Sequence, residues 1–493
     1  MTTPRAETAY RELITRYRDR MLLESCATVL AWDEETYLPS GGVELRGEQQ
    51  ALLARLEHER ATDPALPELL ATAEAGAFTA GSVAAVNLRE LRREYERACC
   101  LPASLVEELA RVTTRAQQAW EEARDGADPA AYLETLGRVV GLVQAQADCV
   151  RGASSRYQAC LEDWEPELRE AELDALLGAL VPAQRELARA AAGPGPGVLR
   201  AEVAPAAQRA IAERIATWCG FDLAGGRIDE AAHPSTIRIG PGDVRLTTRL
   251  TPDRPLDGVF TMLHEVGHGV YDQQLPVELF GTPVGEASSL GLHEAQARML
   301  ENRIGRGRGF WQAALPQLVV LAPALGAWSV EQIVAATNAV DLGASRIRAD
   351  EVTYDLHIAI RVELERALLT GDLRVQDLPE AWDAAYARDL RASTPARRGW
   401  LDDGHWAAAM FGYFPTYTIG NLAGSQLFAA AERAVPDLAA AITRLDLRPL
   451  IDWLRQHVFR FGGLRSTEEI LVGATGRPLA VDDHLTNLRA KAG

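Results

Sequence analysis

The strongest constraint on this chain is a His-Glu-x-x-His pattern inside an apolar run. The run extends from Val259 to Tyr271 and contains His264, Glu265 and His268. Residues four apart lie on the same face of an α-helix, so a helix here brings the two imidazoles together. Two neutral imidazoles form half of a tetrahedral metal site. The pattern therefore predicts a metal-binding helix, and the alternative is a core helix with two hydrogen-bonded histidines.

Two carboxylates complete the expected site. Glu265 is too close to His264 to be a comfortable third ligand, but it can reach a water on the metal, as the general base of a metallopeptidase does. A second helix is expected to start near residues 283–286 and to continue past residue 300, and it carries the adjacent His293 and Glu294. Adjacent helical residues point about 100° apart, so only one of them can face the ion easily. We expect Glu294 to be the third ligand, with a surface carboxylate as the alternative, and His293 to be a supporting or core histidine.

The composition excludes several classes of protein. The chain has 493 residues, of which 47% are apolar and only 6% aromatic, a balance that favours helices over sheets. The formal net charge of -18 argues against binding to nucleic acid. No apolar stretch of about eighteen residues occurs, so no membrane-spanning helix is expected. Six cysteines without a Cys-x-x-Cys pair, and a first segment without the apolar core of a signal peptide, predict a cytoplasmic protein.

Helical periodicity extends over most of the chain. Helices are expected over about residues 8–30 and 44–61, with a turn-rich break at 31–42 between them. We expect one domain over residues 1–493, with a helical N-terminal part at about 1–200 and a catalytic part at about 201–493. The expected fold class is mainly α.

One segment departs from the helical pattern. Residues 236–239 and 244–250 alternate and are rich in β-branched side chains, and Gly240-Pro241-Gly242-Asp243 separates them. This pattern predicts a β-hairpin directly before the metal-binding helix. Farther along, further helices are expected over about residues 330–369. The segment 399–421 gathers aromatic residues, which indicates either a pocket wall or a packed core.

The chain resembles one family, the Taq-type metallocarboxypeptidases, also called thermostable carboxypeptidase 1. The resemblance covers nearly the whole chain and rests on six motifs that occur in the family's order. They stand here as His233-Pro234-Ser235, Asp243-Val244-Arg245-Leu246-Thr247, His264 to His268, His293-Glu294-Ala295-Gln296, Ser345-Arg346-Ile347-Arg348-Ala349-Asp350 and Gly399-Trp400-Leu401-Asp402-Asp403-Gly404-His405-Trp406. The N-terminal Trp32-Asp33-Glu34-Glu35-Thr36 also looks similar to the family.

Four residues depart from the family's motifs. Ser235 replaces Phe, Ala295 replaces Ser or Gly, Ser345 replaces Ile, and Asp402 replaces Gln. None of them removes an expected metal ligand or the base. Because Asp402 adds a carboxylate beside Asp403, we expect a preference for basic residues near the C-terminus of the substrate.

The resemblance implies a large helical zincin-type metallopeptidase with a deep cleft beside a small β-sheet. It implies release of single amino acids from peptides with a free C-terminus. One divalent ion, zinc or alternatively cobalt, would be held by His264, His268 and Glu294, with Glu265 as the general base. Members of the family are commonly homodimers. The alternatives are a helical zinc endo-oligopeptidase and a non-catalytic peptide-binding relative.

Five residues are candidates for substrate binding. An exopeptidase needs a cation for the terminal carboxylate, and the planar fork of Arg suits this task. Arg346 and Arg245 lie in the motifs; we favour Arg346, with a surface ion pair as the alternative. His405 and Tyr417 are candidate donors to the developing oxyanion, and His233 is a further candidate in the first motif.

Overall fold

The computed structural model describes residues 3–150, 152–193, 195–392 and 398–492. The chain divides into two compact units. Unit 1 comprises Met1–Cys99, Val198–Val334 and Ala423–Leu479, and unit 2 comprises Cys100–Gly197, Ala335–Leu422 and Ala480–Gly493. Both units consist mainly of helices, which confirms the expected fold class, and none of the described helices is long and apolar enough to cross a membrane.

The first helices of unit 1 correct one predicted break. Helix α1 extends over Pro4–Thr36, and Trp32, which was placed in the break, is buried within it. No Pro or Gly occurs in this helix after its first residue, so nothing in the backbone ends it before Tyr37. The helices α2, α3 and α4 follow at Val43–Ala61, Leu66–Glu74 and Val83–Cys100.

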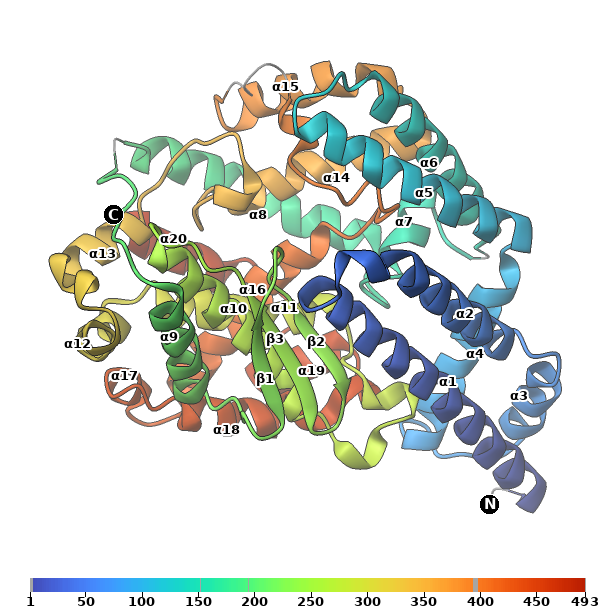
Figure 1. Cartoon of the computed structure of the whole chain (residues 1–493). Coiled ribbons are helices and arrows are strands. Elements are labelled where there is room, and N and C mark those ends of the chain that lie inside the picture. The colour runs from blue at the N-terminus through green and yellow to red at the C-terminus, as the bar shows by residue number, and fades with distance from the viewer. Residues whose placement is uncertain (1–2, 151, 194, 393–397, 493) are drawn as a thin grey trace. The chain divides into compact units, whose positions relative to one another are not determined.

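A three-stranded sheet supports the centre of unit 1. Strands β2 (Thr236–Gly240) and β3 (Asp243–Thr248) are antiparallel, which confirms the predicted hairpin. The turn between them contains Gly242 with a φ of +79°, a conformation that glycine adopts without steric cost. Strand β1 (Gly226–Glu230), which was not predicted, pairs in parallel with β3, so the order is β1-β3-β2 (Figure 1).

Helix α10 (Pro255–Gln273) carries the His-Glu-x-x-His pattern and packs tightly on both sides. A Cβ atom on Gly267 would lie 2.5 Å from Ala297 of the next helix, and one on Gly269 would lie 2.8 Å from Leu246 of β3. Two glycines therefore let α10 approach both neighbours closely. The large apolar core of unit 1 surrounds this helix.

The helix that follows α10 begins later than predicted. Helix α11 extends over Leu290–Arg298, because the side chain of Ser289 accepts the backbone N–H of Leu292 as an N-cap. Residues Pro283–Gly285 form a separate 3-10 turn. A π-helix at Met299–Gly305 continues α11 directly. The other helices of unit 1 are α9 (Pro205–Trp218), α12 (Arg308–Leu321), α17 (Leu438–Ile442), α18 (Arg448–His457) and α19 (Thr467–Thr475), and α13 (Val330–Thr337) begins in this unit.

Unit 2 contains its own apolar core. Its helices are α5 (Ala103–Arg124), α6 (Ala130–Cys149), α7 (Arg156–Leu161), α8 (Glu170–Ala191), α14 (Tyr354–Thr370), α15 (Leu378–Asp389) and α20 (Asp482–Ala492), and α16 (Pro415–Ala434) begins in this unit. The helix expected up to residue 369 starts only at Tyr354, and Arg346 lies in a short 3-10 turn, Arg346–Arg348. Trp400, Trp406 and Phe414 are buried in this core, so much of the aromatic segment is packing.

Candidate metal centre

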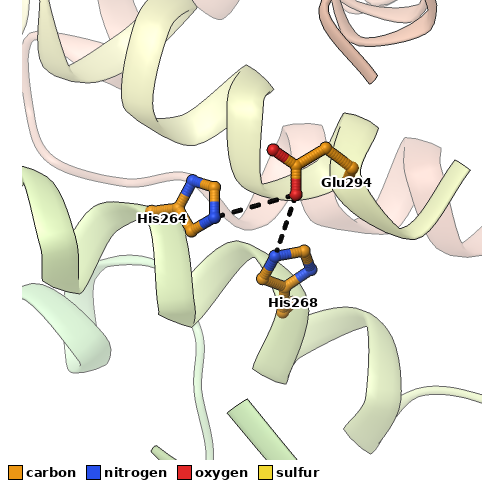
Figure 2. Close-up of side chains that lie close together, drawn as sticks. All are labelled: His264, His268 and Glu294. Carbon is orange, nitrogen blue, oxygen red and sulfur yellow. Dashed lines mark ion pairs between the residues drawn. The ribbon is translucent and has the colours of Figure 1, made fainter. Parts of the chain in front are cut away.

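Three side chains of unit 1 direct ligand atoms at one point. The Nε2 atoms of His264 and His268 lie 3.8 and 3.4 Å from Oε2 of Glu294. One ligand atom from each of the three residues lies within 4.8 Å of the other two. Figure 2 shows both imidazoles extending from one helix toward the carboxylate of another.

Local structure explains this convergence. His264 and His268 are one helical turn apart on α10, and their rings meet edge to face at 4.9 Å between centroids. Glu294 reaches them from α11, which lies against α10 at Gly267. The structure therefore brings together the three residues that the sequence proposed as ligands, although α11 starts later than expected.

The charges at this point suit a cation. Burial opposes ionisation of Glu294, but His264 and Arg298 outweigh it and hold the pKa of that carboxyl well below its usual range. Burial also opposes protonation of His264, yet Glu294 and Glu301 raise the pKa of its imidazole to about 9. The pKa of His268 is lowered, first by burial. Two imidazole nitrogens and an ionised carboxylate fit a divalent metal such as zinc, so the residues present match the ion that the sequence implies.

A second carboxylate orients the first histidine. Oε2 of Glu301 lies 3.1 Å from Nδ1 of His264, on the ring nitrogen opposite the metal-facing one. Arg298 connects the carboxylates, because its Nε donates to Glu294 at 2.7 Å and its Nη1 to Glu301 at 3.2 Å. Such a carboxylate partner fixes the tautomer and ring direction of a ligating histidine.

The expected base, Glu265, is buried and lies beside the sheet. The hydroxyl of Thr236 on β2 is 2.8 Å from Oε2 of Glu265 and 2.9 Å from its backbone carbonyl oxygen. Glu265 is therefore on the same helix as the two histidines. The Thr236 hydroxyl donates a hydrogen bond to Oε2 of its carboxylate.

His293 supports the site from behind. Its Nε2 lies 2.9 Å from Oδ1 of Asp272, and its ring stacks on that of His268 with centroids 4.5 Å apart. Burial lowers the pKa of His293, but Asp272 outweighs it and raises the pKa overall. Of the two roles expected for this histidine, the stacking on His268 favours the supporting one.

Two predicted substrate-binding residues of unit 1 lie around the sheet. Arg245 is on β3, where it forms a bidentate ion pair with Asp243 at 2.8 Å and covers the ring of Trp32 at 4.1 Å. Its neighbour Leu246 faces α10, so alternation along the strand turns Arg245 to the other face of the sheet. His233 precedes β2 and is exposed. The structure does not bring either side chain into contact with the three candidate ligands.

The other three predicted residues form a cluster in unit 2. The guanidinium of Arg346 donates to Oδ1 of Asp403 from Nε at 3.0 Å and from Nη2 at 2.5 Å, and to the hydroxyl of Tyr354 at 2.9 Å. It also lies 4.9 Å from the ring of Tyr417, whose hydroxyl is 3.2 Å from Nε2 of His405. Arg346 is thus held in a buried ion pair, neither free nor on a helix surface.

Two of the four departures from the family's motifs contact each other. The hydroxyl of Ser345 donates to the carboxylate of Asp402 at 3.0 and 3.2 Å, and Asp402 also accepts the backbone N–H of Arg346 at 3.0 Å. An Ile and a Gln at these positions would lack this charged hydrogen bond. Asp402 therefore positions the turn that carries Arg346.

Nearly the whole chain matches one protein family. The sequence model described as the carboxypeptidase Taq (M32) metallopeptidase covers residues 12–492. The chain belongs to this family. The resemblance inferred from the motifs is thereby confirmed, and this M32 chain is a metal-dependent carboxypeptidase, a hydrolase of peptide bonds.

Individual relatives agree with the family. The M32 chain is 40% identical to thermostable carboxypeptidase 1 of Thermus thermophilus and 30% identical to the Pyrococcus furiosus protein of the same name, and these alignments cover 98% and 95% of each chain. Among solved structures, it superposes on the M32 carboxypeptidase of Deinococcus radiodurans with a TM-score of 0.94 at 34% identity, covering 99% of both chains.

Sequence reasoning missed three residues of this M32 site. Glu301 lies seven positions after Glu294, two helical turns away, so the spacing alone could have placed it on the same face. Arg298 lies between them at the same helical spacing. Thr236 had no such signal, because hairpin periodicity does not reveal which strand residue touches the next helix.

Proposed function

We propose that His264, His268 and Glu294 hold one divalent ion, preferably zinc, and that Glu265 is the general base for release of C-terminal residues. The convergence of the three ligand atoms beside Glu265 carries this proposal. Cobalt suits the same ligands, so the identity of the bound ion depends on which metal is available in the cell as well as on the geometry of the site. When bound, such an ion supplies Lewis acidity, which lowers the pKa of water and polarises the scissile carbonyl.

The protein's own groups then perform the proton transfers. Glu265 takes a proton from the attacking water and gives it to the amine that leaves. Glu301 keeps Nε2 of His264 directed at the ion by accepting from Nδ1. His293 packs against the ring of His268 and so restricts its rotation.

Peptide mass spectrometry tests the reaction and its direction. An unblocked peptide should lose single residues from its C-terminus, and a C-terminally amidated copy should not be cut. A chelator should abolish cleavage, and added zinc or cobalt should restore it. Internal cleavage of the amidated peptide would contradict the exopeptidase assignment.

The variant Glu265→Gln tests the base. It should keep its metal, because the three ligands are unchanged, and lose about 10²- to 10⁴-fold in kcat. Mass spectrometry of the protein checks that the metal is kept. Turnover of the unblocked peptide checks that kcat is lost. Wild-type turnover in this variant would show that Glu265 is not the base.

We also propose the substrate-binding roles expected from the motifs. Arg346 would bind the terminal carboxylate, with Arg245 as the second candidate, and His405 and Tyr417 would donate to the oxyanion. His233 would contact the peptide. An Arg346→Lys variant should raise KM for unblocked peptides, because Lys lacks the bidentate fork; an unchanged KM would contradict this role.

We also propose that the protein is a single catalytic domain, located in the cytoplasm and assembled as a homodimer. The family match over residues 12–492 supports a single catalytic domain. The six cysteines include no Cys-x-x-Cys pair, which supports a reducing, cytoplasmic compartment. The family resemblance supports a homodimer, which light scattering on the purified protein would test.

A further inference from the structure

The hydroxyl of Thr236 has two acceptors, and both belong to Glu265. It lies 2.8 Å from the carboxylate oxygen Oε2 and 2.9 Å from the backbone carbonyl oxygen. Because a hydroxyl carries a single proton, that proton is shared between the two oxygens. Thr236 therefore contacts the expected base at its side chain and at its backbone.

The sheet fixes the direction of this hydroxyl. Thr236 pairs with Leu246 across the antiparallel ladder, and directly opposed residues share one face of a sheet. Leu246 contacts α10 at Gly269, so the shared face is the one toward the metal-binding helix. Threonine is also stiff at χ1, which reduces the freedom of the hydroxyl further.

We propose that Thr236 is a positioning residue for the general base, an inference that rests on the proposed role of Glu265. Its hydroxyl holds Oε2 and leaves Oε1 to take the proton from the attacking water. When Oε1 is protonated, Oε2 is a carbonyl oxygen and still accepts the same hydrogen bond. The carboxyl group therefore keeps one orientation while it gains and releases a proton.

A purely structural role for Thr236 would look different. If the hydroxyl only satisfied the backbone carbonyl of Glu265, its removal would affect folding or metal binding rather than turnover. If only the bulk of the side chain mattered, Val would replace Thr and Ser would not. The two roles therefore separate by a comparison of Val with Ser.

The experiment compares three variants of the metal-loaded protein. Thr236→Val removes the hydroxyl at nearly constant shape and should lower kcat by about 10- to 100-fold, as expected for a misplaced catalytic group, with KM nearly unchanged. Thr236→Ser restores the hydroxyl and should stay within about threefold of wild type. Thr248→Val is the matched control and should stay fully active. Thr248 is buried in the same sheet, and its hydroxyl has no hydrogen-bond partner among the described residues.

Metal affinity provides the second readout. Competition with a chelator should give the same affinity for Thr236→Val as for wild type, because Thr236 contacts the base and none of the three ligands. In a Glu265→Gln background, Thr236→Val should change the residual rate by less than about twofold, because the pair acts as a unit.

Specific outcomes would overturn the inference. Wild-type kcat in Thr236→Val, a loss in Thr236→Ser as large as in Thr236→Val, or a parallel loss of metal affinity would each do so. If Thr236→Val does not fold, Thr236→Ala against Thr236→Ser gives the same comparison. An inactive Glu265→Gln with an active Thr236→Val refutes only the positioning role, whereas an active Glu265→Gln refutes the base itself.

Discussion

Two buried clusters of charged side chains satisfy their charges in opposite ways. In unit 1, two imidazoles and the carboxylate of Glu294 face one another at 3.4 to 3.8 Å, longer than direct charge-assisted hydrogen bonds. In unit 2, Asp403 binds Arg346 and Arg361 directly, at 2.5 Å to an Nη2 atom of each. The first cluster leaves room between its three ligand atoms for a cation, although Arg298 also pairs with the other oxygen of Glu294. The second cluster is closed around two guanidinium groups.

This difference separates a cluster that is open to an ion from one whose charges are already paired. A bound ion would stabilise the unit 1 cluster, because its three ligand atoms come together only in the folded chain. The unit 2 cluster already contains its counter-charges, so breaking it leaves a buried charge without compensation.

The largest effect is expected from Asp403→Asn. This variant removes the carboxylate between Arg346 and the fully buried Arg361 and should destabilise the protein by about 3–5 kcal/mol. Urea unfolding of the variant and wild type measures the difference. Asp402→Asn is the matched control, since Asp402 is more exposed and should cost much less. Equal stability of Asp403→Asn and wild type would remove the distinction between the clusters.

The pH dependence of His405 gives the next largest effect. Burial lowers the pKa of its imidazole to about 4, with Arg346 and Arg361 acting in the same direction and Asp403 against them. In the unfolded chain this imidazole takes up a proton near pH 6.5, whereas in the folded protein it stays neutral until about pH 4. The free energy of unfolding is therefore full above pH 6.5 and falls as the pH is lowered toward 4. The loss is at most about 3 kcal/mol and should be absent from His405→Gln. Urea unfolding of both proteins from pH 7 to pH 4 tests this, and parallel curves would contradict the assignment.

Particular residues show how far the sequence could predict this structure. The i, i+4 spacing placed His264 and His268 on one face, and the angle of about 100° between adjacent helical residues separated Glu294 from His293. The surroundings of Arg346 were not predictable, because its partner Asp403 is distant in sequence and contacts it only through the fold. Strand β1 was not predicted for a similar reason. It pairs in parallel with β3, so no hairpin turn in the sequence indicates that a strand is there.

Glu301→Gln should weaken the metal site without breaking it. Loss of the charged partner on Nδ1 of His264 should lower metal affinity by about 10- to 100-fold, while kcat of the fully loaded protein changes less. Chelator competition measures the affinity. Glu331→Gln is a suitable control, because Glu331 pairs with Arg308 on the surface of the same unit. A Glu301→Gln protein with unchanged affinity would show that the carboxylate does not orient the ligand.

The smallest effect concerns substrate choice. Asp402 was expected to favour basic residues near the substrate C-terminus, but its oxygens already accept from Ser345 and from the backbone of Arg346. A partly exposed carboxylate adds only about 0.2–1 kcal/mol to a contact with a cation. Asp402→Gln should therefore lower the ratio of kcat/KM for peptides ending in Arg over those ending in Leu by at most about fivefold. A ratio that stays constant would limit Asp402 to the support of the turn that carries Arg346.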